Sequence, residues 1–472
     1  MNDYAPTTAF TAETAVASVD ASSTSLLTDM YELTMLQGAL ASGTATRRSV
    51  FELFGRRLPA SRRFGVVAGT GRLLDAIEAF AFTPSQIDFL HRTGVVNDET
   101  LDFLRDYRFT GTVRGYAEGE CYFAGSPLLT VEGTFAEACI LETLALSIYN
   151  YDCAVASAAS RMTIAAHGRP CVDFGARRAH EQAAVAAARA SVVGGFVGTS
   201  NLEAGLLYGI PTVGTSAHSF TLLHDSEEDA FAAQVASLGP STTILVDTYD
   251  IATGVERAVK AARAAGGELG AVRLDSGDLV AEAFKVRAQL DTLGATSTKI
   301  TVTNDLDEHA IAALGAAPVD SYGVGTKLVT GSGRPTAALV YKLVEREGAD
   351  GTMEEVAKFS SGGKSTVGGR KWAGRRLTSE GTAAEELVVS SSSQDQGLAA
   401  LSEAGARPLQ VLLVDEGRII EEHRGKEALS AAAERHRAAR AELPYDAWRL
   451  SDGGSALPTR HVDLDGRSAT RR

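Results

Sequence analysis

The amino-acid sequence predicts an α/β protein in which a parallel sheet covered by helices is joined to a second, mixed α/β domain. Strand-like runs in the middle of the chain, such as 242–250 (TTILVDTYD) and 270–278 (GAVRLDSGD), alternate with helix-like stretches. The runs are apolar until they end in polar residues, which is typical of parallel strands buried on both faces. The chain has 472 residues, which is more than one hydrophobic core usually organises, and 44% of them are hydrophobic. The length therefore predicts two or three domains.

The first part of the chain predicts a tail and then a mixed α/β domain. Residues 1–25 are rich in Ala, Thr and Ser, with no basic leader and no continuous apolar core, and we expect a flexible tail. From Leu26 apolar residues recur at helical spacing, with Thr28 or Asp29 as the N-cap. Strand-like and helix-like segments follow in turn, so residues 26–150 are predicted to form the N-terminal α/β domain.

Residues 151–345 carry repeated strand and helix units, which favour an α/β barrel or an open doubly wound sheet. Asp247, Asp275 and Asn304 follow successive strands, and the turn Gly323-Val324-Gly325 ends the next one. Because the carboxyl ends of parallel strands meet at one edge, these residues are expected to share one site.

The last part of the chain predicts a C-terminal segment, 346–450, that returns to the α/β domain, and a flexible tail at 451–472. A Gly-rich stretch at 362–376 contains Lys364, Arg370, Lys371, Arg375 and Arg376. Two interpretations stay open for it, a solvated loop or a cationic arm over an anionic ligand.

Composition excludes some classes of function. Forty-five basic against 59 acidic residues give a formal charge of −14, which disfavours binding to nucleic acid or to an anionic membrane. The four cysteines form no CxxC pair, which argues against a zinc site and a disulfide framework and favours a reducing cytoplasm. No apolar run is long enough to span a membrane.

Several residue types point to chemistry on an anionic substrate. Arg273 and Asp275 alternate to the same side of a strand end, and a series of such acids favours a shared site over isolated ion pairs. Gly323, Gly325 and Thr326 have the composition of a phosphate-binding turn, although neither a P-loop nor a GxGxxG fingerprint is present. His218 stands between small residues in GTSAHSF, which leaves its ring reachable from a cleft.

Aromatic and basic residues add to this pattern. Phe174 follows a strand beside Gly175 and Arg177, where it could stack on a flat, negatively charged ring instead of packing into the core. Tyr31 has the same two interpretations. Arg56 and Arg57 form a second basic pair.

Taken together, these motifs resemble the nicotinate phosphoribosyltransferase family over roughly residues 26–376. The resemblance is carried, in order, by TDMYELTM, FELFGRR, DFGARRAH, GTSNLEAGLLYGIPTVGTSAHSF, LVDTYDI, RLDSGDL and SYGVGTKL. It implies an irregular α/β barrel with a second α/β domain built from N-terminal and returning C-terminal segments. It also implies a cytoplasmic homodimer with shared active sites, which makes nicotinate mononucleotide and pyrophosphate from nicotinate and phosphoribosyl pyrophosphate in NAD biosynthesis. ATP hydrolysis is coupled to this reaction through a phosphohistidine.

The resemblance also implies roles for single residues. His218 would be phosphorylated, and Ser219 would help to hold the phosphate. Asp247 and Asp275 would orient the histidine, the ribose hydroxyls or a Mg²⁺ ion bound mainly through the substrate pyrophosphate. The remaining expected contacts are Phe174 and Tyr31 of the partner subunit on the pyridine ring, Arg177 and Arg273 on the carboxylate or the phosphates, Gly323, Gly325 and Thr326 on the 5′-phosphate, and Arg56 and Lys364 on the pyrophosphate.

Three alternatives stay open. The nicotinamide phosphoribosyltransferase family reads the amide with an aspartate after DFGxR, whereas GTSNLEAGLL offers Asn201, taken here as a substrate-binding residue, and Glu203. Quinolinate phosphoribosyltransferase calls for more basic residues and uses no phosphohistidine. A non-catalytic barrel that binds a phosphate ligand would not need His218, Asp247 and Asp275 together. TVGGRK departs from the family, which in many members has a proline before the glycine.

Overall fold

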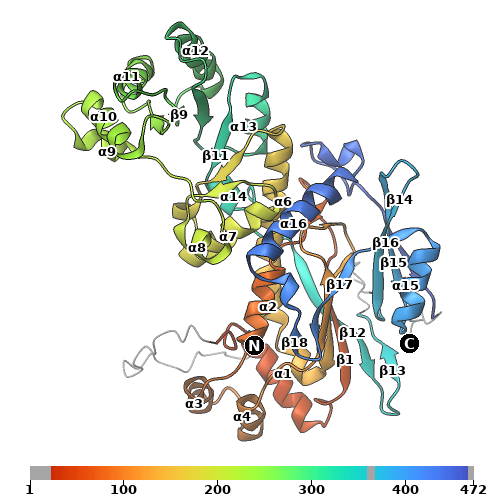
Figure 1. Ribbon diagram of the computed structural model, residues 1–472. Coiled ribbons are helices and arrows are strands. Elements are labelled where there is room, and N and C mark those ends of the chain that lie inside the picture. The colour runs from red at the N-terminus through yellow and green to blue at the C-terminus, as the bar shows by residue number, and fades with distance from the viewer. Residues whose placement is uncertain (1–22, 359–366, 466–472) are drawn as a thin grey trace, which may run out of the picture.

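The computed structural model describes residues 23–358 and 367–465, which form two α/β regions joined by one long helix (Figure 1). The expected N-terminal tail lies almost entirely outside these residues. No helix in the described part of the chain is long and apolar enough to cross a membrane.

The first region is built on a seven-stranded sheet in the order β13-β12-β1-β5-β3-β17-β18, and all of its neighbouring strands are antiparallel. Strands from the last third of the chain therefore pair with strands from the first third, as expected for returning C-terminal segments. The strands are β1 (Arg48–Gly55), β3 (Thr112–Tyr116), β5 (Pro127–Thr134), β12 (Leu339–Glu347), β13 (Met353–Glu355), β17 (Gln410–Asp415) and β18 (Arg418–Ile419).

Short capped helices accompany this sheet. Thr83 forms a capping box with Gln86, and Thr134 forms one with Glu137. Asp29 is the N-cap of the first helix, as one of the two predicted candidates, but its side chain makes no capping hydrogen bond. The helices are α1 (Met30–Ala41), α2 (Thr70–Glu78), α3 (Pro84–Thr93), α4 (Asp98–Arg105) and α5 (Phe135–Cys139), and a small ribbon pairs β2 (Gly65–Val66) with β4 (Cys121–Tyr122).

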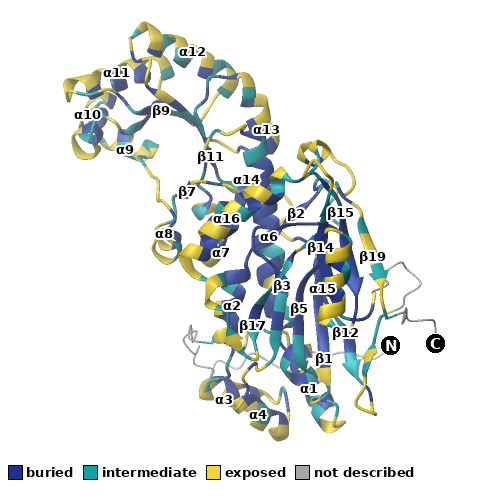
Figure 2. Cartoon of the chain, turned by 45° about the vertical axis from the view of Figure 1, so that its right-hand side comes forward, coloured by how far each residue is buried: buried dark blue, intermediate teal, exposed yellow. Residues whose placement is uncertain are grey.

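Helix α6 (Glu142–Ala165) connects the two regions and is buried along most of its length (Figure 2). Its first half packs Leu144 and Ile148 into the core of the first region. Its second half packs Val155 and Met162 into the core of the second region. The predicted boundary at residue 150 therefore falls inside a helix shared by both regions.

The second region is a curled, parallel half-barrel of six strands in the order β7-β6-β11-β10-β9-β8. The predicted irregular α/β barrel is confirmed in this open form, with β7 and β8 as its edges. The strands are β6 (Cys171–Asp173), β7 (Gly198–Thr199), β8 (Thr243–Leu245), β9 (Ala271–Leu274), β10 (Lys299–Val302) and β11 (Ser321–Val324).

Helices pack around this half-barrel (Figure 1). Most of them follow one strand and precede the next along the chain. Asp250, Asp278 and Asp307 cap three of them with side-chain hydrogen bonds, which explains the acids that follow each strand by a few residues. The helices are α7 (Glu181–Val193), α8 (Leu202–Tyr208), α9 (His218–Leu223), α10 (Glu227–Leu238), α11 (Ile251–Ala264), α12 (Leu279–Thr292), α13 (Glu308–Ala313) and α14 (Thr326–Val329), with 3-10 turns η1 (Ala176–Arg178) and η2 (Leu314–Ala316).

A four-stranded sheet in the order β16-β14-β15-β19 completes the chain. Its last strand lies within the predicted flexible tail 451–472 but pairs in parallel with β15, so that prediction is wrong for residues 459–463. The elements are β14 (Lys371–Leu377), β15 (Ala383–Ser390), β16 (Ala406–Pro408), β19 (Thr459–Asp463), α15 (Gln394–Glu403), α16 (Gly425–Ala441), η3 (Glu421–His423) and η4 (Tyr445–Trp448).

The cationic-arm interpretation of residues 362–376 is wrong for the residues that the structure describes there. Lys371 Nζ lies 2.8 Å from Glu52 Oε2, and both side chains are buried. Arg375 is fully buried against Glu386, while Arg370 and Arg376 pair with Glu132 and Glu385. These charges hold β14 in place instead of facing a ligand. Lys364 lies outside the described residues.

Candidate active site

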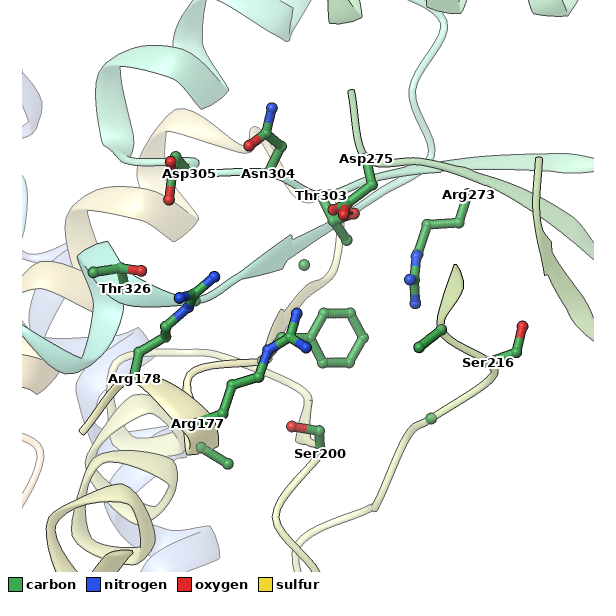
Figure 3. A pocket seen from close by; sticks show the side chains of 16 residues that line it. Arg177, Arg178, Ser200, Ser216, Arg273, Asp275, Thr303, Asn304, Asp305 and Thr326 are labelled. Carbon is green, nitrogen blue, oxygen red and sulfur yellow. Dashed lines mark hydrogen bonds between the residues drawn. The ribbon is translucent and has the colours of Figure 1, made fainter. Parts of the chain in front are cut away.

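A hollow of about 350 Å³ opens at the carboxyl ends of β6, β9, β10 and β11 (Figure 3). Residues predicted from four separate motifs line it together, which confirms that the strand ends converge on one site. The predicted residues on its wall are Phe174, Arg177, Arg273, Asp275, Asn304, Gly323, Gly325 and Thr326.

The Phe174 ring is fixed by the strand ends on either side of it. Its backbone N–H donates to Val324 O at 2.8 Å, and the ring lies over Gly323, where a Cβ would stand 2.4 Å from a ring carbon. The preceding Asp173 is buried and accepts hydrogen bonds from Gly175 N and Thr199 Oγ1, both at 2.7 Å. Burial raises the pKa of the Asp173 carboxyl above its ordinary value. The hollow therefore has one rigid aromatic wall.

Arginine side chains border this aromatic wall. Arg177 and Arg178 lie on η1 and are exposed, whereas Arg273 on β9 is partly buried (Figure 3). Burial lowers the pKa of the Arg273 guanidinium from its ordinary value, and its Nε is buried with no hydrogen-bond partner. Its Nη1 donates to the neutral Thr215 Oγ1 at 3.3 Å. An anion in the hollow would complete its hydrogen bonding.

The strand-end acids differ in their surroundings. Asp247 Oδ2 accepts hydrogen bonds from Asp275 N at 2.9 Å and Ser276 Oγ at 2.6 Å, so Asp247 ties the ends of β8 and β9 together. Asp275 itself lines the hollow and accepts a hydrogen bond from Thr303 Oγ1. Asp247 is thus a buried anchor, whereas Asp275 faces the hollow.

His218 begins α9 beside these acids. Its Nδ1 lies 3.1 Å from Thr248 Oγ1, and its Nε2 lies 4.0 Å from Asp247 Oδ1. The side chain is 42% exposed, which agrees with the small residues that precede it. The ring is therefore reachable from solution and held between a hydroxyl and a carboxylate.

Some residues on the wall were missed by the sequence patterns. They are Ser200, Ser216, Thr303 and Asp305. Of these, only Asp305 could have been found from the sequence, because it follows Asn304 in the same motif. Asn304 has φ 87°, in the left-handed region that non-glycine residues seldom adopt, and such strain is concentrated at functional sites.

Other predicted residues, His218 and Asp247 among them, do not line this hollow within one chain. Tyr31 lies on α1 and Arg56 directly after β1, both in the first region. Ser219 follows His218 on α9, and Asn201 caps α8 by accepting a hydrogen bond from Ala204 N at 2.9 Å.

The residues present fit a Mg²⁺ ion only if most of its ligands come from a substrate. Within residues 23–358 and 367–465, no group of three or more His, Cys, Asp or Glu is arranged to hold a metal ion. Asp275 offers a carboxylate in the hollow, whereas Asp247 is buried, with Oδ2 hydrogen-bonded to Asp275 N and Oδ1 4.0 Å from His218 Nε2. Pyrophosphate oxygens would supply the remaining ligands.

Comparisons with known proteins identify the family. A model of the nicotinate phosphoribosyltransferase N-terminal domain matches residues 26–150, and a model of the nicotinate phosphoribosyltransferase family matches residues 170–361. Nicotinate phosphoribosyltransferase pncB1 of Mycobacterium tuberculosis is 51% identical over 445 residues, which cover 93% of this chain and 95% of that protein. The human nicotinate phosphoribosyltransferase is 31% identical over 430 residues, which cover 77% and 79% of the two chains.

Solved structures agree with this result. The crystal structure of human nicotinic acid phosphoribosyltransferase superposes with a TM-score of 0.78 at 25% identity, over 92% of this chain and 97% of that chain. A nicotinate-nucleotide pyrophosphorylase from Pyrococcus furiosus shares the fold, with a TM-score of 0.69 at 24% identity over 91% and 99%. The expected resemblance is confirmed, and the chain belongs to the nicotinate phosphoribosyltransferase family.

Proposed function

We propose that this protein transfers the phosphoribosyl group of phosphoribosyl pyrophosphate to nicotinate, producing nicotinate mononucleotide and pyrophosphate for NAD biosynthesis. The observation that carries the proposal is that a fixed aromatic ring, Phe174, lines one hollow together with Arg177 and Arg273. Figure 3 shows the two guanidinium groups in that hollow. A flat ring with a carboxylate needs both an aromatic face and a cation. The relatives named above carry the same activity in their names.

The rest of the hollow suits phosphoribosyl pyrophosphate. The turn from Gly323 to Thr326 offers backbone N–H groups to the 5′-phosphate, because its glycines allow close approach. As the bond between the ribose carbon and the pyrophosphate oxygen breaks, positive charge develops on the ribose. The Asp275 carboxylate, held by Thr303, stabilises that charge while the pyridine nitrogen forms the new bond.

We further propose that ATP phosphorylates His218 and that hydrolysis of this phosphohistidine drives the transfer. The imidazole is exposed enough to meet the γ-phosphate, and the attacking nitrogen forms a bond to phosphorus as ADP leaves with the electrons of the broken P–O bond. The phosphorylated ring is positively charged while its other nitrogen keeps its proton. Asp247 Oδ1 is buried, has no hydrogen-bond partner and lies 4.0 Å from His218 Nε2, so its negative charge would balance the positive charge of the ring.

Further proposals concern Mg²⁺, assembly and location. Mg²⁺ would neutralise the leaving pyrophosphate, with Asp275 as its protein ligand.

A homodimer would cover exposed leucines on two helices. These are Leu202 and Leu206 on α8, and Leu222 and Leu223 on α9. Tyr31 of the partner subunit would then complete the pyridine sandwich. All four cysteines are free and buried, which suits the cytoplasm.

The test compares three pyridine substrates in the presence and absence of ATP. Purified protein is incubated with phosphoribosyl pyrophosphate and Mg²⁺, with nicotinate, nicotinamide or quinolinate in separate reactions, each with and without ATP. We expect mononucleotide from nicotinate, more of it with ATP, and matching ADP. Product from nicotinamide but not from nicotinate would mean that the hollow recognises an amide. No product from any of the three bases would support a non-catalytic barrel that binds a phosphate ligand.

A further inference from the structure

A second hollow of about 340 Å³ lies at the opposite end of the half-barrel from the candidate active site. His167 and Gly168 on its wall precede β6, whereas Phe174 of the active site follows that strand. In a chain with a formal charge of −14, the wall carries three basic side chains, those of His167, Arg440 and Arg449, and none of the described acidic side chains lines it. The described lining of the hollow therefore carries basic side chains and no acidic one.

Arg440, on the last turn of α16, is the central group of this wall. Its Nη1 donates only to neutral oxygens, to Thr163 Oγ1 at 2.8 Å and Ser160 O at 3.4 Å. Burial lowers the pKa of its guanidinium, and in the described part of the chain no carboxylate forms an ion pair with it. The more deeply buried Arg189 and Arg375 do pair with carboxylates, Glu118 and Glu386. Arg440 thus has a charge that an anion from solution could balance.

Two aromatic rings stand beside this cation. Tyr445 is 80% exposed and Trp448 is 36% exposed, and their ring centroids are 5.6 Å apart. Trp448 Nε1 donates to Arg440 O at 3.3 Å, which ties the indole to the end of α16. The following backbone is held by Arg161, whose Nη2 donates to Leu450 O at 2.8 Å. Exposed aromatic rings on an anchored segment next to arginines are a surface on which a planar base can stack.

We propose that this hollow binds a nucleoside monophosphate, with the base against Tyr445 and Trp448 and the phosphate on Arg440 and Arg449. The volume lies within the range of small-molecule sites. Arg449 is paired with Asp446 at 2.8 Å but is 61% exposed, so it is free to turn towards a phosphate. This site uses no residue of the candidate active site, and the inference does not depend on the proposed reaction.

The test uses AMP as the probe on the full-length protein, with adenosine and ribose 5-phosphate as the two half-ligands. The chain has only two tryptophans, Trp372 and Trp448, and Trp372 is buried in the core of the four-stranded sheet. We expect AMP to quench tryptophan emission with saturation, and this change to disappear in Trp448→Phe. Calorimetry should give at least about tenfold weaker binding for either half-ligand, because each lacks one set of contacts.

Variants locate the site. Arg440→Gln should weaken AMP binding by about tenfold or more, and Tyr445→Ala by a similar factor; Tyr445 is so exposed that its loss leaves the fold intact. Arg177→Gln, in the active-site hollow, is the matched control and should leave the quenching unchanged. The proposal is overturned if millimolar AMP leaves the emission of Trp448 unchanged, if ribose 5-phosphate reverses the AMP quenching of Trp448 at an equal concentration, or if Arg177→Gln weakens binding as much as Arg440→Gln.

Discussion

Oδ1 of Asp247 is buried, has no hydrogen-bond partner and lies 4.0 Å from Nε2 of His218. An unsatisfied buried carboxylate oxygen costs free energy, and a positive charge on the imidazole would offset that cost. The pair would thus suit the phosphorylation of His218 that we propose above.

Replacing His218 by alanine should therefore abolish ATP coupling and leave slow, ATP-independent phosphoribosyl transfer, because Phe174, Arg177 and Asp275 stay in place. ADP and nicotinate mononucleotide would be measured together by chromatography. Coupled ATP hydrolysis that survives in His218→Ala would falsify the assignment of the phosphohistidine.

Thr248 holds the other nitrogen of the same ring, with its Oγ1 3.1 Å from His218 Nδ1. Thr248→Val keeps the side-chain shape but removes this hydrogen bond, and we expect ATP coupling to fall by roughly tenfold, corresponding to about 1.4 kcal/mol. The rate without ATP should change little. Thr248→Ser is the matched control, since it keeps the hydroxyl. Coupling that stays at the parent level in Thr248→Val would show that this hydrogen bond is not needed.

The aromatic wall can be tested at Gly323. A Cβ there would stand 2.4 Å from the Phe174 ring, so Gly323→Ala should displace the ring and raise KM for nicotinate by roughly tenfold or more. Gly315→Ala is a suitable control, because nothing lies within 4 Å of its added Cβ. Steady-state kinetics with varied nicotinate would separate KM from kcat. An unchanged KM in Gly323→Ala would argue that Phe174 does not contact the pyridine ring.

The convergence of this site could be predicted from sequence because it follows from strand periodicity. Parallel strands in register bring Leu245 opposite Arg273 and Arg273 opposite Thr301, so polar residues just after each strand must meet at one edge. Ser200 and Ser216 could not be predicted in this way. Small polar residues are common in every loop, and only the three-dimensional path of the chain brings these two to the hollow.

The errors in the C-terminal part have a different physical cause. Lys371 and Arg375 stand in a Gly-rich, charged run that is typical of a loop, but their carboxylate partners belong to β1 and β15. Likewise, β19 is a strand only because β15 offers a parallel edge. Such long-range pairing leaves no local pattern, and tertiary context overrides intrinsic propensity here.

The Lys371–Glu52 pair gives a stability prediction that also tests its structural role. Lys371→Met leaves the Glu52 carboxyl buried without its cation, which should cost about 3–5 kcal/mol and lower Tm by several degrees. Because burial already raises the pKa of Glu52, the carboxyl can take up a proton, so the loss should be smaller at low pH. The double variant Glu52→Gln, Lys371→Met should recover most of the stability. Calorimetry of the three proteins measures this, and a cationic arm would predict lost substrate affinity with unchanged Tm instead.

His436 gives the prediction for acid stability. It lies on α16, with Nδ1 3.2 Å from Gly119 O and Nε2 2.8 Å from Ser160 Oγ, so it links the helix to both regions of the chain. Burial, with a smaller contribution from the nearby Arg440 cation, lowers the pKa of its imidazole from 6.5 to about 3. The unfolded chain therefore binds a proton below pH 6.5 that the folded chain does not. Stability from this group is complete above pH 6.5 and is lost as the pH falls towards 3, by about 2 kcal/mol at pH 5.

The matched variant for this prediction is His436→Gln, which cannot titrate. It should be less stable than the parent at pH 7.5, because it loses part of the hydrogen bonding to Gly119 and Ser160. The difference in Tm between the two proteins should then shrink steadily as the pH falls to 5. Only the parent has a histidine that takes up a proton on unfolding, so only the parent loses stability from this group. Other groups titrate equally in both proteins and cancel in this difference. A Tm difference that stays constant from pH 7.5 to 5 would mean that His436 does not titrate between the folded and unfolded states.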